Sequence, residues 1–200
     1  MSALEQSAAN WEKTFTATTA EQTHAFGARL AEVLQAGDLL VLSGELGAGK
    51  TTFTQGLGEG LGVRPGIISP TFVLVRIHPN LPDGPRPGGP DLVHVDAYRL
   101  GSAAEIDDID LENTMDSSVT VVEWGHERVE HLSESRLEID LHRVIGLGGL
   151  RLPAAATGSS TGLDFDGEET DEPRTIVMRG YGPRWSTAPD LGNPEGGLQC

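Results

Sequence analysis

The run GELGAGKT, from Gly44 to Thr51, fits the pattern G-x-x-x-x-G-K-[ST] of a phosphate-binding loop. A triphosphate is densely charged, so such a loop must bring backbone N–H groups close to it, and glycines remove the side chains that would prevent this. Lys50 supplies positive charge for the β- and γ-phosphates, and the Thr51 hydroxyl is placed to ligate Mg²⁺. The candidate phosphate-binding residues are Gly44, Glu45, Leu46, Gly47, Ala48, Gly49, Lys50, Thr51 and Thr52.

The residues around the motif are those that such a loop requires. Asp38–Leu42 is a short apolar run between turn residues, as expected of a buried parallel strand. From Thr51 to about Leu61 the sequence predicts a helix, whose N-terminal dipole would face the same phosphates. The chain has two lysines, Lys13 and Lys50, and one occupies the position that the motif requires. This order of strand, loop and helix favours a phosphate site over an accidental glycine-rich turn.

Two further predicted strands end in a carboxylate. Asp96 follows Leu92–Val95, and Glu123 follows Val119–Val122. Because the carboxyl ends of parallel strands converge on the ligand crevice of an open α/β sheet, both acids are candidates to face a metal bound by Thr51. The pattern leaves open which acid touches Mg²⁺ and which acts through water. A helix cap or a surface position is the plain alternative for either acid.

Two other residues lie close to these segments in the sequence. Thr71, in the loop sequence SPTF, is a candidate sensor of the γ-phosphate, although the same sequence is an ordinary entry into a strand. Trp124 directly follows Glu123, a position where tryptophan more often serves packing than nucleotide binding. The histidines without a convincing ligand partner are His94, His131 and His142.

The chain carries 30 acidic against 14 basic residues, a formal charge of −16, and it has no basic stripe. Tight direct binding to nucleic acid is therefore not expected, and a basic partner would have to hold any nucleic acid. The single cysteine, Cys200, excludes an internal disulfide and a cysteine-based zinc site. The sequence shows neither a signal peptide nor a membrane-spanning run, so we expect a cytoplasmic protein that is monomeric when free.

The 200 residues suit one folded domain. We expect a flexible tail over 1–13 and a P-loop domain over 14–145, with an exposed Pro- and Gly-rich excursion over 78–90. The composition of 146–173 predicts a disordered insertion, followed by a strand of the same domain within 174–186 and a flexible tail over 187–200. The expected strands are 14–18, 38–42, 71–77, 92–96, 119–123, 135–141 and 174–179, and the expected helices are 20–34, 51–61, 105–112 and 126–131.

Four segments, GELGAGKTTFTQGL, SPTF, HVDAYRL and VEW, occur in this order. Together they resemble the TsaE family (also called YjeE-type), the small ATPases of bacterial tRNA threonylcarbamoyladenosine synthesis. The resemblance extends from about Thr14 to about Leu141, and RGYGPRW near the end of the chain resembles the family more loosely. The segments 78–90 and 146–173 depart from the family without removing a motif residue.

The resemblance implies an α/β fold of the P-loop NTPase type, a three-layer sandwich with a central mixed, largely parallel sheet. It also implies ATP and Mg²⁺ as ligands, slow hydrolysis, and action on the TsaD and TsaB proteins, which carry out threonylcarbamoyl transfer to adenosine in tRNA. The chain would contact tRNA only indirectly, through these partners. Hydrolysis in the family is thought to reset or activate the assembly.

Site residues carry over from the family by position. Its phosphate-binding lysine and Mg²⁺-binding threonine fall on the motif residues already named. Glu123 resembles the metal-coordinating glutamate, and Asp96 resembles a required aspartate near the metal or the water. Thr71 resembles the switch threonine, and Trp124 resembles the tryptophan beside the nucleotide site. The candidate catalytic residues are therefore Lys50, Thr71, Asp96 and Glu123, and the candidate metal ligands are Thr51, Asp96 and Glu123.

Two other functions are compatible with the motifs. A small-molecule kinase would share the phosphate loop but usually needs an arginine-rich lid; Arg99 and Arg128 are the nearest candidates, and the sequence has no lid-like arginine cluster. A nucleotide-dependent binding module with incidental turnover would bind a partner tightly under the control of ATP or ADP. The acidic composition agrees with the tRNA-modification hypothesis, because the partners would hold the tRNA.

Overall fold

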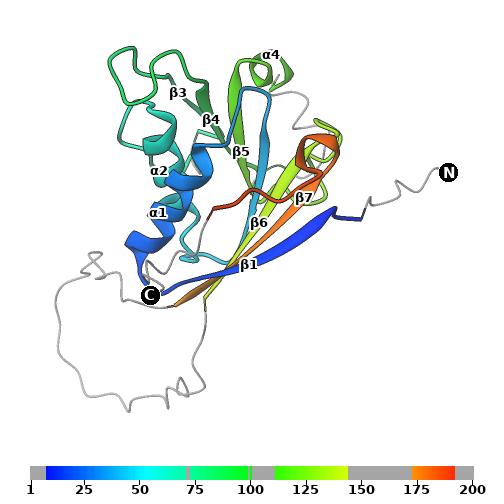
Figure 1. Cartoon of the computed structure of the whole chain (residues 1–200). Helices are drawn as coiled ribbons and strands as arrows, with labels where there is room; N and C mark the ends of the chain where they lie inside the picture. Colours follow the sequence, from blue (N-terminus) through cyan, green and yellow to red (C-terminus); the bar gives the residue numbers. More distant parts are fainter. Residues whose placement is uncertain (1–7, 71–72, 99, 101–110, 144–172, 192–200) are drawn as a thin grey trace, which may run out of the picture.

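The computed structural model describes residues 8–70, 73–98, 100, 111–143 and 173–191 (Figure 1). No helix within these ranges has the length and apolar character needed to cross a membrane. In chain order the elements are β1 (Trp11–Ala17), α1 (Ala20–Ala31), β2 (Leu39–Ser43), α2 (Lys50–Leu61), β3 (Val75–His78), β4 (Asp91–Asp96), α4 (Glu112–Met115), β5 (Ser118–Glu123), β6 (Arg136–Arg143), β7 (Arg174–Tyr181) and the 3₁₀ helix η1 (Pro183–Trp185).

The strands form one mixed sheet in the order β1-β7-β6-β2-β5-β4-β3. The neighbouring strands β6, β2, β5 and β4 are parallel, whereas β7 and β3 pair antiparallel with β6 and β4. β1 pairs antiparallel with β7 and so runs in the direction of the parallel strands. The predicted α/β fold with a mixed, largely parallel sheet is confirmed. β2 is the middle strand, so strand ends on both sides flank the loop that follows it.

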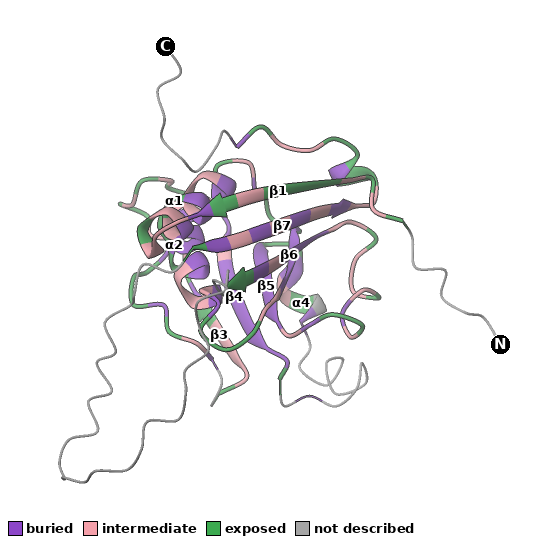
Figure 2. Cartoon of the chain, turned by 90° about the horizontal axis from the view of Figure 1, so that it is seen from below, coloured by how far each residue is buried: buried purple, intermediate pink, exposed green. Residues whose placement is uncertain are grey.

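Alternate residues of the central strands pack on opposite faces of the sheet. Leu40 and Leu42 of β2 join a core cluster with Phe26 of α1 and Phe53 of α2. Their neighbours in β2 join a second cluster, which α4 and the segment after β5 cover on the other face. Figure 1 shows α1 and α2 side by side on the first face, and Figure 2 shows that β5 is buried while the edge strand β1 is mostly exposed or half-buried. This layering corresponds to the predicted three-layer sandwich.

α1 and α2 lie so close together that their contact requires glycine. A Cβ atom on Gly56 would lie 1.9 Å from the carbonyl oxygen of His24, and one on Gly27 would lie 2.3 Å from that of Phe53. Glycine weakens the intrinsic helix preference of α2, but it lets the two backbones approach. The glycine-rich sequence of α2 therefore reflects helix packing as well as the phosphate loop before it.

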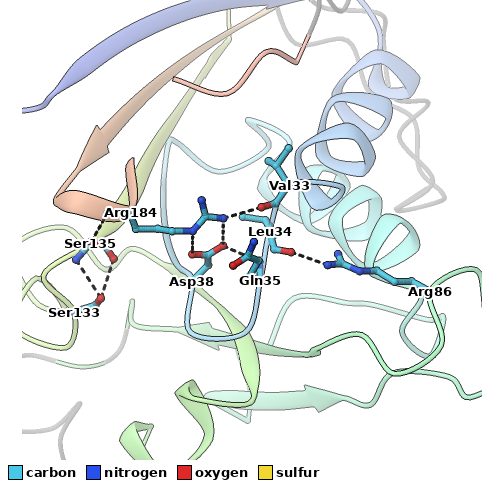
Figure 3. Close-up of polar contacts among 8 residues, drawn as sticks. All are labelled: Val33, Leu34, Gln35, Asp38, Arg86, Ser133, Ser135 and Arg184. Carbon is cyan, nitrogen blue, oxygen red and sulfur yellow. Dashed lines mark hydrogen bonds and ion pairs between the residues drawn. The ribbon is translucent and has the colours of Figure 1, made fainter. Parts of the chain in front are cut away.

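The segment 78–90, expected to be an exposed excursion, is mostly exposed or half-buried, and two of its side chains cap the ends of both helices. The Asn80 side chain donates to the carbonyl oxygen of Leu61, the last residue of α2, at 2.8 Å. Arg86 donates to the carbonyl oxygen of Leu34 at 2.9 Å (Figure 3). It also donates to the carbonyl oxygen of Ala31, the last residue of α1, at 2.9 Å. The last carbonyls of a helix have no partner within the helix, so these side chains satisfy them. Proline and glycine content excludes regular structure in this segment, but it does not reveal these specific side-chain contacts.

A second arginine reaches the end of α1 from the C-terminal part of the chain (Figure 3). Arg184 of η1 pairs with Asp38, with Nε 3.1 Å from Oδ1 and Nη2 3.2 Å from Oδ2. Its Nη2 also donates to the carbonyl oxygen of Val33 at 2.8 Å. Asp38 directly precedes β2, so this contact ties η1 to the start of the strand that carries the phosphate loop.

Two predicted boundaries were wrong. Trp11–Lys13, assigned to a flexible tail, belong to β1, and the Trp11 ring covers Gly180 of β7, where a Cβ atom would lie 2.4 Å from the ring. Leu191, assigned to the C-terminal tail, is buried in the cluster beneath α1 and α2. Local patterns missed both because distant segments bury these residues.

The segment 126–131, expected to be a helix, forms turns instead, and Glu127 there adopts a positive φ of 63° that interrupts a helix. Residues 71–72 of an expected strand, residues 105–110 of an expected helix and nearly all of the 146–173 segment lie outside the described residues.

Candidate functional site

The phosphate loop connects the end of β2 to the first residue of α2. Gly44 has a φ of +140°, and a Cβ atom on it would lie 2.3 Å from the carbonyl oxygen of Leu141 in β6, so a side chain does not fit there. Gly49 adopts the left-handed conformation, with a φ of +100°, directly before α2. The first N–H groups of a helix lack acceptors within it, so the loop ends at a site that favours anions.

Lys50 is buried at the start of α2 and folds back onto its own loop. Its Nζ donates to the carbonyl oxygens of Gly44 at 2.8 Å and Glu45 at 3.1 Å, and it lies 4.4 Å from the ring centroid of Trp124. Burial lowers the pKa of the Lys50 ammonium, and the negative charges of Glu123, Asp96 and Glu45 partly offset this effect. The predicted phosphate-binding cation therefore lies within the field of both predicted acids.

Asp96 and Glu123 end the neighbouring parallel strands β4 and β5, and they are direct register partners. Both side chains are 3% exposed. The residues next to them in the chain belong to the second cluster, and successive side chains of a strand point to opposite faces. Both acids therefore face the side of the sheet that carries α2. Asp96 Oδ1 accepts the backbone N–H of Tyr98 at 2.9 Å. The structure thus brings the two acids together, beside Lys50, at the edge where the phosphate loop begins.

Trp124 directly follows Glu123 and lies beside Lys50. It adopts a positive φ of 61°, which is rare for a bulky residue and costs roughly 1–3 kcal/mol. Its backbone N–H donates to the carbonyl oxygen of Leu42 at 2.9 Å, and its ring meets the Tyr98 ring edge-on at 5.5 Å. Strained backbone of this kind concentrates at functional sites, and here it places the indole over Lys50.

The remaining predicted residues lie at the same edge, with one exception. Thr51 and Thr52 form the first turn of α2 and are half-buried, Ala48 is fully buried, and Leu46 is 90% exposed at the tip of the loop. Thr71 lies outside the described residues.

Sequence reasoning missed two arginines beside the loop. Arg143 and Arg174 are register partners at the ends of β6 and β7. The Arg143 Nη1 atom lies 3.6 Å from the position of a Cβ on Gly47, and the Arg174 Nε atom lies 3.2 Å from that of a Cβ on Gly49. They add positive charge to the loop on the side opposite the two acids. Only the strand order reveals this, because the two arginines are far apart in the sequence and have no motif of their own.

A third missed residue is His94. Its Nε2 lies 2.8 Å from Oε1 of Glu123, and both side chains are buried. The sequence shows no partner for this histidine, because the partner lies on a different strand and only the pairing of β4 with β5 brings the two side chains together.

Two other features lie away from this edge. A cavity of about 360 Å³ at the far end of α2 is lined by His24 and Glu59, which pair with each other at 3.4 Å, and by mostly small or apolar residues.

The side chains of His126, Glu130 and Glu138 lie close together, with one possible metal-ligand atom from each within 4.8 Å of the others. Glu138 is already paired with an arginine of β6. Its neighbours in β6 face α1 and α2, so its own side chain projects from the opposite face of the sheet. Neither feature adjoins the phosphate loop.

Comparison with known proteins connects this geometry to one family. A family model described as "Threonylcarbamoyl adenosine biosynthesis protein TsaE" matches residues 17–145. These residues include the phosphate loop, both acids and Trp124.

Similar curated proteins bear the name tRNA threonylcarbamoyladenosine biosynthesis protein TsaE. The one from Streptomyces coelicolor is 49% identical over 163 residues, which cover 81% of this chain and 93% of that protein. The one from Mycobacterium tuberculosis is 46% identical over 137 residues, covering 66% and 79%, and the one from Bacillus subtilis is 40% identical over 124 residues, covering 62% and 73%. The crystal structure of Bacillus subtilis YdiB matches with a TM-score of 0.58 and 29% identity, covering 88% of this chain and 89% of that one.

Proposed function

Because this chain belongs to the TsaE family of tRNA threonylcarbamoyladenosine biosynthesis, we propose that it is a Mg²⁺-dependent ATPase that supports threonylcarbamoyl transfer by acting on TsaD and TsaB. The observation that carries this proposal is the convergence of Lys50, Asp96 and Glu123 at one edge of the sheet. A phosphate-binding cation beside two buried carboxylates is the donor set that a metal-bound triphosphate requires.

Each residue has a proposed task. The backbone N–H groups of the loop and the start of α2 bind the phosphates, and Lys50 exchanges its two loop carbonyls for β- and γ-phosphate oxygens. Thr51 and the acidic pair would hold Mg²⁺, which would supply positive charge to offset the charge that develops on the transferred phosphoryl group. Thr71 acts as the switch residue for the γ-phosphate.

The two carboxylates are well suited to a shared metal and water. Asp96 has one oxygen bound to a backbone N–H and Glu123 has one bound to His94, so each retains a second oxygen for a cation or an attacking water. Their burial keeps competing bulk water away and strengthens their electrostatic effect on the phosphates. Trp124 packs beside the reacting groups and limits the access of solvent.

The charge of the whole chain supports an indirect role in tRNA modification. With a formal charge of −16, the protein repels nucleic acid, so we infer that TsaD and TsaB hold the tRNA while this chain hydrolyses ATP. We place this reaction in the cytoplasm, with the free chain a monomer.

Arginine placement argues against a kinase. Arg128 donates to the carbonyl oxygen of Ala97 and is thereby held against the sheet, rather than projecting as a lid residue. Arg99, the other lid candidate, lies outside the described residues.

Hydrolysis of ATP by the purified chain, alone and with TsaD and TsaB from the same source, tests the proposal. We expect slow turnover that requires Mg²⁺, rises with the partners, and is lost in Lys50→Ala and Thr51→Ala. Turnover that ignores the partners would contradict the role in their assembly, and a phosphorylated metabolite in a screen of added acceptors would favour a kinase. Wild-type turnover in Lys50→Ala would contradict the site assignment itself.

A further inference from the structure

The buried pair formed by His94 and Glu123 lies directly behind the proposed metal site. His94 is 0% exposed, its Nε2 lies 2.8 Å from Oε1 of Glu123, and the pair joins β4 to β5. His94 precedes Asp96 by two residues, so both side chains project from the same face of β4. One face of two adjacent strands thus presents Asp96 and Glu123 at its end, with His94 one step behind them.

Chemistry fixes the direction of this hydrogen bond. A carboxylate that binds a metal ion is ionised and only accepts, so in the proposed site Nε2 of His94 carries the hydrogen and donates it to Oε1. Hydrogen bonds to a charged acceptor in a dry interior are among the stronger ones. The bond therefore restrains the rotation of the Glu123 carboxyl group and leaves Oε2 as the oxygen that is available to a cation.

We propose that His94 is a positioning residue that orients the Glu123 carboxylate for Mg²⁺ binding through a single oxygen. The inference rests on the proposed function, because it takes Glu123 as a metal ligand. Histidine–carboxylate contacts just outside a metal's ligands commonly orient those ligands, and their loss costs roughly 10- to 100-fold in metal affinity or activity.

The other nitrogen of His94 supports this role over a purely structural one. Nδ1 is buried and has no hydrogen-bond partner among the described residues. An unsatisfied buried polar atom destabilises the folded state, so an apolar side chain would serve simple strand packing better. A histidine at this position makes sense if the contact of Nε2 with Glu123 is what the site needs.

Substitutions at His94 separate the position of the donor from the bulk of the side chain. In His94→Gln the amide nitrogen falls near the position of Nε2 and can still donate to Glu123. In His94→Asn the amide nitrogen falls near Nδ1 and cannot. His78 is a matched control, because it is another buried histidine on the adjacent strand β3, and no contact joins it to Glu123 within the described residues.

The experiment measures Mn²⁺ binding by electron paramagnetic resonance in the presence of saturating ADP, with ADP affinity in EDTA and melting temperature measured on the same samples. We expect His94→Asn to weaken Mn²⁺ binding by about 10- to 100-fold. His94→Gln and His78→Gln should stay close to the wild type, and metal-free ADP affinity should be unchanged in all variants.

Equal Mn²⁺ affinities in His94→Gln and His94→Asn, both folded, would overturn the inference while the proposed function stands. A loss in His78→Gln as large as that in His94→Asn would likewise overturn it, since the effect would then come from core packing. If the wild type itself binds neither ADP nor Mn²⁺ with ADP, the proposed function fails, and the role of His94 fails with it.

Discussion

Arg184 and Asp38, which lie 146 positions apart in the sequence, form a two-point ion pair at the start of the phosphate-loop strand. Asp38 is 4% exposed, so its carboxylate depends on this guanidinium and on the backbone N–H of Gln35 for its hydrogen bonds. The fold around the candidate site is therefore held partly by Arg184, a residue of the C-terminal segment.

We expect Arg184→Ala to lower the free energy of unfolding by roughly 1–3 kcal/mol, because it leaves Asp38 with an unpaired buried charge. Arg184→Lys should recover little, since an ammonium cannot contact both carboxylate oxygens and Val33 in the same geometry. Urea unfolding measures the free energy of unfolding of both variants and of the wild type. In Asp38→Asn the further loss from Arg184→Ala should shrink, and an undiminished loss in that background would show that the pair is not the cause.

The contact between α1 and α2 predicts that alanine is tolerated differently at two glycines of the same helix. Relative to glycine, alanine favours the helical conformation by about 1 kcal/mol at either position. At Gly56 the new Cβ would meet the carbonyl oxygen of His24 at 1.9 Å, and a backbone cannot yield cheaply. At Gly58 it would meet the terminal Cδ1 of Ile67 at 2.1 Å, which a rotation of that side chain relieves.

We therefore expect Gly56→Ala to destabilise the protein by roughly 1–3 kcal/mol, as overpacking does, and Gly58→Ala to be clearly milder. Thermal or urea unfolding of the two variants decides this. Equal effects at the two positions would mean that helix propensity, rather than the close approach of the helices, determines the outcome.

His78 predicts a pH dependence of stability. Burial lowers the pKa of its imidazole below the ordinary value of 6.5, and the neighbouring His94, Arg64 and Arg76 lower it further. The unfolded chain then binds a proton at a higher pH than the folded chain does. Above the unfolded pKa the imidazole is neutral in both states, and His78 does not lower the free energy of unfolding. As the pH falls below 6.5 towards the lower folded pKa, the unfolded chain binds a proton that the folded chain does not, and the free energy of unfolding decreases.

His78→Gln should accordingly flatten the decline in unfolding free energy on the acidic side of that value. Urea unfolding of the wild type and the variant over a pH series, at constant ionic strength, measures the difference. Parallel declines in the two proteins would assign the pH dependence to other groups.

Trp124 predicts an optical signal for the nucleotide site. Its ring lies over Lys50, which must change partners when phosphate binds. We expect ATP with Mg²⁺ to change the intrinsic fluorescence of the wild type and of Trp11→Phe, but not that of Trp124→Phe. A signal that persists in Trp124→Phe would place the responding tryptophan elsewhere.

The sequence predicted the placement of the candidate site residues well where that placement depends on consecutive residues. The loop from Gly44 to Thr51 needs consecutive residues of defined type, and the strands that end in Asp96 and Glu123 are recognisable from their apolar runs. The convergence of these acids followed from a general property of parallel strands. For 78–90, proline and glycine content predicts a segment without regular structure, but composition does not show that Asn80 and Arg86 hydrogen-bond to helix ends.

The phosphate-loop motif and the α/β class could be predicted from the sequence alone, because they depend on short runs of neighbouring residues, and the same runs predict the residues proposed to bind a metal-bound triphosphate. Only the tertiary structure decided that His94 contacts Glu123, that Arg143 and Arg174 flank the loop, and that Arg184 closes onto Asp38. These contacts arise from strand order and register, which bring together residues that no local pattern relates.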